Sequence, residues 1–442
     1  MSTTLPALRR RDRGLPVFGK LFSYLKDPVA LMQHHWDTYG AVSPFPSLAG
    51  RHAVLLLGPE ACEAALVNRD KAFVNGPAWS RIIGPFFHDG LMLLDFEEHH
   101  QHRRIMQGAF TRDRLAGYVD LLHPALDAGL ADWRPADAFP AYPRLKQLTL
   151  DIAAHIFMGG AEDTSPAEMD RLNAAFIDCV QAAAGVVRAD VPFTRWGRAY
   201  RGRRELETWI RHYVPKRRAE PREDLLSALC HLDDEGGTGF SDDAIVDHMI
   251  FLMMAAHDTS TITVSTMLQH LGQHPEWQER CRAEALALGP TPSLAELESM
   301  TDTALVMKEA LRLVAPVTVL MRRTVADTEV CGVAIPADTD VIVGVQFSHV
   351  MPRYWRDPER FDPERFAEPR REDKGHRLVW QPFGGGVHKC LGLHFAGAEV
   401  HAILHRMLRE FTWQVSPDYR APLDFHSLPY PTDGQPIRLR HR

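Results

Sequence analysis

One segment of this 442-residue chain has to form a long helix that is buried along its middle. Ser241, followed by two aspartates, is a typical helix start, with a capping hydroxyl and acidic groups in the first turn. All eight residues from 249 to 256 are apolar, and a helix that is apolar on every face is a buried one. Gly272 and Pro275 end the pattern after about thirty residues, or about 45 Å of helix. The chain therefore needs a large core around this helix.

Helical patterns dominate the rest of the sequence, and strand-like stretches are few and short. They cover residues 54–57, residues 330–335 with a turn at Gly332, and residues 341–345. We therefore expect a mainly α fold with small β-sheets, formed as a single domain over residues 1–442. The segment 1–20 is expected to be flexible.

Composition narrows the classes of function. The net charge is −7, from 50 basic and 57 acidic side chains, which argues against nucleic acid as a partner. The six cysteines lie far apart, so neither a zinc site nor a disulfide framework is indicated. No apolar stretch follows the N-terminal arginines, although a secretory signal and a membrane anchor both require one. We expect a cytoplasmic protein without a membrane anchor.

Five consecutive polar residues, 257–261, interrupt the apolar middle of the long helix. Polar groups in a buried helix must be hydrogen-bonded or face a wet cavity. One interpretation is local, because Thr and Ser hydroxyls can bond to a carbonyl one turn earlier. The other is functional, because Asp258 next to Thr259 pairs a carboxylate with a hydroxyl, as a proton relay requires. From these residues alone, both interpretations stay open.

A glycine-rich segment, residues 383–392, brings one cysteine to the start of a helix. Three consecutive glycines allow the backbone to curl and to aim N–H groups at the sulfur of Cys390. The start of a helix also favours a thiolate, and Gly392 leaves room for a flat ligand near the backbone. These are the requirements of a thiolate ligand to haem iron. The alternative is an ordinary buried cysteine.

The pattern Phe383, Gly386, Cys390 and Gly392 resembles the haem-binding loop of the cytochrome P450 family. The resemblance implies haem b (iron protoporphyrin IX) as cofactor, with Cys390 as the iron ligand and the other three residues as part of the haem site. It also implies the cytochrome P450 fold, in which haem lies between a long central helix and the cysteine loop.

The polar interruption of the long helix resembles a second motif of the same family. Asp258 matches the family's acid and Thr259 its alcohol, which implies that both are catalytic. Ala256 stands where a glycine is usual and is expected to border the haem. His257 falls at a variable position and is expected to be structural or to line a solvent channel.

A third motif is Glu309-x-x-Arg312, which places two opposite charges on one helix face. Such pairs are common, and the alternative is an exposed ion pair that contributes little to stability. The motif lies between the long helix and the cysteine loop, as it does in the family. Arg365, in a downstream segment that also resembles the family, is expected to complete a structural network that fixes the cysteine loop.

Haem carries two propionates, which call for cationic side chains, and arginine suits carboxylates. His99 and Arg103, one helical turn apart, lie in a segment that resembles the family's haem-contacting helix. Arg322 resembles the propionate arginine, with Arg323 the weaker candidate. His388 stands where many members have arginine, so its charge would depend on pH.

The resemblance implies a monooxygenase that inserts one oxygen atom from O2 into an organic substrate. Electrons are expected from NAD(P)H through a separate ferredoxin-type donor and its reductase, and the protein is expected to be a monomer. Two alternatives are a peroxide-driven haem peroxygenase and a non-catalytic haem sensor. Asp258 and Thr259 argue against both, because neither class needs a proton relay.

By the same resemblance, residues 72–94 form a lid over the substrate pocket. The candidate pocket residues are all apolar: Trp79, Ile82, Ile83, Phe86, Phe87, Leu252, Val317, Val319 and Leu428. They suggest a sizeable apolar substrate of the steroid, terpenoid or fatty acyl type. The alternative for each of them is simple packing in the core.

Overall fold

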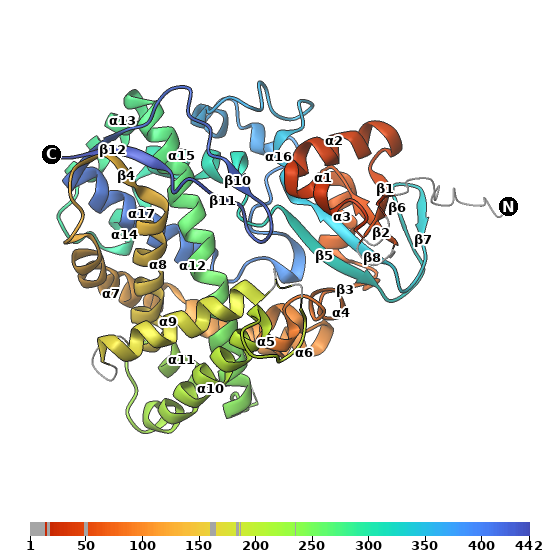
Figure 1. Ribbon diagram of the computed structural model, residues 1–442, viewed down its shortest axis with the longest axis horizontal. Coiled ribbons are helices and arrows are strands. Elements are labelled where there is room, and N and C mark those ends of the chain that lie inside the picture. Colours follow the sequence, from red (N-terminus) through yellow and green to blue (C-terminus); the bar gives the residue numbers. More distant parts are fainter. Residues whose placement is uncertain are drawn as a thin grey trace. The chain divides into compact units, whose positions relative to one another are not determined.

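The computed structural model describes residues 14–15, 18–47, 52–159, 165–182, 185, 187–234 and 236–442 (Figure 1). Most of the N-terminal segment 1–20 lies outside the described residues. The chain forms two compact units. The first, which we call the sheet unit, comprises Met1–Arg81, Lys308–Cys390 and Leu423–Tyr430. The second, the helical unit, comprises Ile82–Met307, Leu391–Pro422 and Pro431–Arg442.

The sheet unit is built on a five-stranded sheet with the order β1-β2-β8-β5-β3. β2 and β8 run parallel with Ala53 opposite Asp340, and β5 runs antiparallel to β8 with Arg322 opposite Val341. The strands of this unit are β1 (Val42–Pro46), β2 (His52–Leu56), β3 (Phe73–Val74), β5 (Val319–Thr324), β6 (Thr328–Val330), β7 (Val333–Ile335), β8 (Asp340–Gly344) and β10 (Leu423–Asp424). Its helices are α1 (Leu21–Lys26), α2 (Pro28–Tyr39), α3 (Pro59–Val67), α4 (Gly76–Trp79), α16 (Val345–Val350), η6 (Pro363–Phe366), η7 (Glu372–Lys374) and η8 (Gly386–His388).

The three strand-like stretches of the sequence are confirmed as β2, the β6–β7 hairpin and β8. The hairpin turns at Cys331 and Gly332, whose φ angles of 48° and 77° match the twist of the flanking strands. β1 escaped prediction because it contains Pro44 and Pro46, which weaken a strand signal. The structure tolerates both prolines because β1 is an edge strand.

The helical unit contains most of the helices. They are α5 (Gly84–Phe87), η2 (Leu91–Leu93), α6 (Phe96–Gln107), η3 (Gly108–Phe110), α7 (Arg112–Leu130), α8 (Ala141–Met158), α9 (Pro166–Gln181), α10 (Arg195–Ala219), α11 (Leu225–His231), α12 (Asp242–Gln273), α13 (Pro275–Ala287), α14 (Leu294–Glu298) and α17 (Leu393–Glu410). A small sheet has the order β4-β12-β9, formed by β4 (Ala136–Pro140), β9 (Phe411–Gln414) and β12 (Pro436–His441). Two elements contain residues of both units: α15 (Thr301–Leu313) and β11 (Tyr430–Pro431).

The long buried helix is confirmed as α12, which has 32 residues. The Ser241 hydroxyl accepts a hydrogen bond from the Ala244 backbone N–H at 3.2 Å, so the predicted cap is present. α12 packs against α8, α10 and α17, and Figure 1 shows these helices around it. The mainly α fold with small sheets is therefore confirmed.

Within the part of the chain that the structure describes, no helix combines the length and the apolar composition needed to cross a bilayer.

Candidate active site

The cysteine loop contains a turn that requires glycine. Gly384 and Gly386 have φ angles of 67° and 64°, and a Cβ on Gly386 would lie 1.9 Å from the carbonyl oxygen of Leu66. The Cys390 backbone N–H donates to the Phe383 carbonyl at 2.9 Å and closes the loop. Cys390 is exposed, whereas Cys62 in the same unit is buried, which raises the pKa of its thiol to about 12. Cys390 is thus an accessible thiol on a constrained loop.

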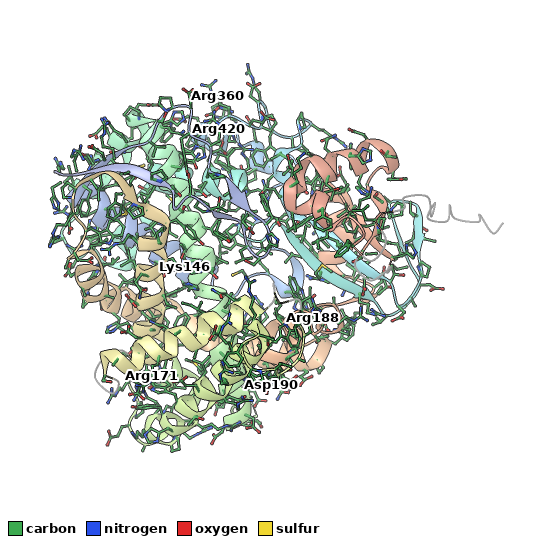
Figure 2. The ribbon with its side chains drawn as sticks, viewed as in Figure 1. Lys146, Arg171, Arg188, Asp190, Arg360 and Arg420 are labelled. Carbon is green, nitrogen blue, oxygen red and sulfur yellow. The ribbon has the colours of Figure 1, made fainter. Side chains whose placement is uncertain are left out.

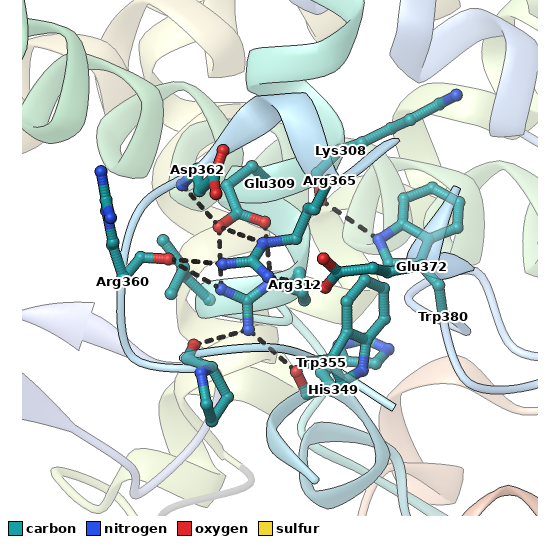
Figure 3. A network of polar contacts seen from close by, with 12 residues as sticks. Lys308, Glu309, Arg312, His349, Trp355, Arg360, Asp362, Arg365, Glu372 and Trp380 are labelled. Carbon is teal, nitrogen blue, oxygen red and sulfur yellow. Dashed lines mark hydrogen bonds and ion pairs between the residues drawn. The ribbon is translucent and has the colours of Figure 1, made fainter. Parts of the chain in front are cut away.

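A buried ion network lies in the same unit (Figure 3). Arg312 makes a bidentate pair with Glu309, with its Nε 2.7 Å and its Nη2 2.8 Å from the two carboxylate oxygens. Arg365 Nε donates to the same carboxylate at 3.1 Å and its Nη1 to Glu372 at 2.8 Å. The side chains of Glu309, Arg312 and Arg365 are 0% exposed. The structure thus brings the three predicted network residues together, and the exposed-pair alternative for Glu309 and Arg312 is wrong.

Replacing Glu309 with glutamine is expected to lower the free energy of unfolding by about 3–5 kcal/mol, because two buried guanidinium groups lose their shared anion. Denaturant titration of the haem-loaded protein measures this change. The control is Glu298→Gln, which breaks the exposed 2.7 Å pair between Glu298 and Arg112 and should change stability little. Equal effects of the two substitutions would contradict a special role of the buried network.

The polar interruption of α12 carries both an ion pair and a local hydrogen bond. Lys146 on α8 places its Nζ 3.0 Å from Asp258 Oδ1, and the Lys146 side chain is 33% exposed (Figure 2). The Thr259 hydroxyl donates to the Ala255 carbonyl at 2.8 Å, which is the local bond that the sequence allowed. Although most of α12 is buried, four of its residues form an accessible strip: Met254, Ala255, Ala256 and Thr259. Thr259 is therefore back-bonded and still reachable from this strip.

His257 is enclosed next to this strip. Its side chain is 1% exposed and its ring packs edge-on against Phe176, with 5.6 Å between the ring centroids. Burial lowers the pKa of His257 to about 4, although Asp258 opposes this shift. The imidazole is therefore neutral near pH 7, which fits the structural role that we expect for it.

Two residues that we did not predict, Ser260 and Glu399, connect α12 to α17. The Ser260 hydroxyl donates to the carboxyl group of Glu399, which is 1% exposed. Burial raises the pKa of Glu399 to about 8, and the bond from Ser260 opposes the rise. Glu399 therefore holds a proton at neutral pH, inside the helical unit.

This raised pKa predicts a specific pH dependence of stability. A pKa above the ordinary value of 4.5 means that the contribution of Glu399 is complete at low pH and is lost as the pH rises through about 8. Glu399→Gln removes the titration but keeps a polar group of similar shape. Between pH 4.5 and 8 the melting temperature of the wild-type protein should fall relative to that of the variant. If the melting temperatures of the two proteins change in parallel over this pH range, Glu399 does not titrate there.

Each unit contains two of the candidate propionate ligands. His99 and Arg103 lie on α6 of the helical unit, where His99 is buried. Arg322 on β5 and His388 in η8 belong to the sheet unit, and Arg322 is 4% exposed. Arg323, the weaker candidate, already pairs with Asp338 and with Asp340, the latter at 2.7 Å. Its charge is therefore compensated by these two carboxylates.

The sequence model of one known family, described as Cytochrome P450, matches residues 10–433. The chain belongs to the cytochrome P450 family. It is thus a haem monooxygenase by family, and its relatives carry matching names. A Mycobacterium tuberculosis protein named as cytochrome P450 136 is 46% identical over 435 residues, covering 98% of this chain and 88% of the relative. Abscisic acid 8'-hydroxylase 2 of Oryza sativa subsp. indica is 29% identical over 445 residues, covering 96% and 85%.

Similarity to a solved structure extends over the whole cytochrome P450 chain. The structure described as "Retinoic acid bound cyanobacterial CYP120A1" superposes with a TM-score of 0.89 at 26% identity, covering 100% of both chains. The fold expected from the sequence is therefore confirmed.

The residues present in this cytochrome P450 fit a haem group. Cys390 offers an accessible thiol, and the accessible strip of α12 offers small side chains beside a hydroxyl. A Cβ added to Gly392 would meet nothing within 4 Å, so the backbone there is open to a flat ligand. His99, Arg103, Arg322 and His388 supply the cationic donor types that propionates need. Cys390 as the iron ligand and the cationic side chains as propionate donors stay predictions.

The candidate pocket residues differ in their surroundings. Phe86 is 0% exposed and its ring lies 5.1 Å from the rings of both Trp196 and Tyr200, so core packing describes it well. Ile83, Phe87 and Leu252 are also buried. The remaining candidates are half-buried: Trp79, Ile82, Val317, Val319 and Leu428.

Proposed function

We propose that this cytochrome P450 hydroxylates a hydrophobic small molecule, with Cys390 as the residue that would hold the iron of haem b and with Asp258 and Thr259 transferring protons. Haem, when bound, supplies the reductive activation of O2. One observation supports the proposal most: Asp258, which pairs with a partly exposed lysine, directly precedes Thr259 on the accessible strip of an otherwise buried helix. A haem protein that only binds a ligand does not need this arrangement.

Lys146, Asp258 and Thr259 have separate roles in proton transfer. Lys146 is one-third exposed and holds the Asp258 carboxylate at 3.0 Å, so it connects this buried group to solvent. Asp258 takes up protons from that side, because a carboxylate is the proton acceptor beside the hydroxyl. The Thr259 hydroxyl directs them at the accessible strip. His257 does not take part, because burial lowers its pKa to about 4 and keeps it neutral.

For the substrate we propose an isoprenoid-type molecule within the steroid, terpenoid and fatty acyl range. The half-buried candidates Val317, Val319 and Leu428 are apolar. One relative is named for abscisic acid and the similar solved structure is described as retinoic acid bound, and both compounds are isoprenoid acids. The test is a titration of the haem-loaded protein with isoprenoid acids, steroids, fatty acids and sugars, followed by the Soret shift. A shift with isoprenoid acids and none with sugars is expected. Shifts with polar compounds alone would overturn the proposal.

For the electrons we propose NAD(P)H as the source, through a ferredoxin-type donor and its reductase. Arg356 in the sheet unit has a side chain that is 84% exposed, and Lys389 in the cysteine loop is exposed as well. Both suit an acidic donor protein. Reconstitution with a ferredoxin system should support turnover that falls as the salt concentration rises. Equal turnover with peroxide alone would favour a peroxygenase instead.

For the location and the oligomeric state, we propose a cytoplasmic monomer.

A further inference from the structure

His349, in the last turn of α16, links two parts of the sheet unit that the sequence motifs treat separately. The residue is 0% exposed. Its carbonyl oxygen accepts a hydrogen bond from Arg312 Nη1 at 2.9 Å, which connects it to the buried ion network (Figure 3). Its ring Nε2 lies 2.9 Å from the backbone nitrogen of Gln381, just before the glycine-rich loop. His349 thus joins the two, with its backbone carbonyl on the ion network and its ring on the segment that leads to Cys390.

The ring must be neutral to make this contact. A backbone N–H can only donate, so Nε2 of His349 has to accept, and the ring proton resides on Nδ1. Burial and, to a smaller extent, the nearby Arg312 lower the pKa of His349 to about 3. The acceptor therefore persists over the physiological pH range.

Hydrogen bonds continue from Gln381 to the cysteine. The Gln381 carbonyl accepts from the Gly384 N–H at 3.0 Å, and the Phe383 carbonyl accepts from the Cys390 N–H at 2.9 Å. The Gln381 side chain donates to the Ser348 hydroxyl at 3.0 Å, and Trp380 Nε1 donates to the Lys308 carbonyl at 3.1 Å. The loop entrance is thus held at three points, and the bond to His349 is the one that holds its backbone.

We propose that His349 is a positioning residue for the haem-thiolate centre: through the bond from Gln381 it sets the loop backbone, whose N–H groups are expected to point at the Cys390 sulfur. This inference rests on the proposed role of Cys390 as iron ligand. Hydrogen bonds to a ligating sulfur reduce its electron donation and so raise the reduction potential of the iron. Loosening the loop should therefore lower that potential.

The experiment uses the haem-loaded 442-residue chain and four substitutions, of which His349→Asn is needed only if His349→Phe does not fold. His349→Phe keeps a flat ring but cannot accept, and His349→Gln places an amide oxygen where Nε2 lies. Gln381→Ala keeps the backbone N–H and removes only the side-chain bond to Ser348. We expect a more negative reduction potential and a partial loss of the red-shifted ferrous carbonyl band for His349→Phe. Both readouts should stay near wild type for His349→Gln and Gln381→Ala.

Two outcomes would overturn the inference while the wild-type carbonyl band stays normal. One is a His349→Phe protein with the wild-type potential and band, even if it melts earlier, because a merely structural role moves only the melting temperature. The other outcome applies if His349→Phe yields no folded protein. His349→Asn then replaces it, because the asparagine side chain is too short for its amide oxygen to reach the Gln381 N–H. Equal reduction potentials of His349→Asn and His349→Gln would overturn the inference. An abnormal carbonyl band in the wild-type protein would instead overturn the proposed function itself.

Discussion

Replacing Cys390 with serine is expected to abolish monooxygenase activity while the fold persists. A serine hydroxyl stays protonated at neutral pH and cannot supply the electron donation of a thiolate. Cys390 is exposed on its loop, so the substitution removes no core packing. Product formation with a reconstituted electron donor measures the loss, and the melting temperature checks the fold.

The matched control is Cys331→Ser. Cys331 is the other exposed cysteine of the described residues and lies in the turn of the β6–β7 hairpin of the same unit. This variant should keep full activity and a normal ferrous carbonyl spectrum. Turnover by the Cys390→Ser protein at the wild-type rate would show that another group ligates the iron.

The second large effect is expected at the acid–alcohol pair of α12. Asp258→Asn removes the carboxylate that pairs with Lys146 at 3.0 Å, and an amide cannot replace a carboxylate as proton acceptor. Turnover should fall on the order of 10²-fold, the usual contribution of a positioned acid or base. Thr259→Ala should leave electron consumption high but divert it from product. Parallel measurement of NAD(P)H consumed and product formed separates the two effects.

Thr266 provides the control for Thr259, because both hydroxyls donate to the carbonyl four residues earlier. The distances are 2.8 Å from Thr259 to Ala255 and 2.9 Å from Thr266 to Ile262. Only Thr259 belongs to the accessible strip. Thr266→Ala should therefore keep the wild-type ratio of product to electrons. The same ratio in both variants would mean that Thr259 is simply back-bonded.

Local patterns made α12 predictable. Its cap, its apolar run and its polar interruption are all encoded within about thirty neighbouring residues. The hairpin turn at Gly332 was predictable for the same reason, and the structure has it.

Contacts between distant segments were not predictable. The sequence around Lys146 does not indicate its ion pair with Asp258, because that pair forms only when α8 packs against α12. Glu399 looks like a surface residue of an amphipathic helix until α17 buries it against Ser260. Composition likewise could not separate a pocket wall from core packing. Phe86 could be assigned to core packing only from the positions of Trp196 and Tyr200 on α10.

The central claim is that Cys390 binds haem iron as a thiolate. The measurement that tests it most directly is the absorption spectrum of the purified, reduced wild-type protein under carbon monoxide. A strongly red-shifted Soret band, the signature of a thiolate ligand, is the expected result. A Soret band without that shift, as a neutral nitrogen ligand gives, would contradict the claim.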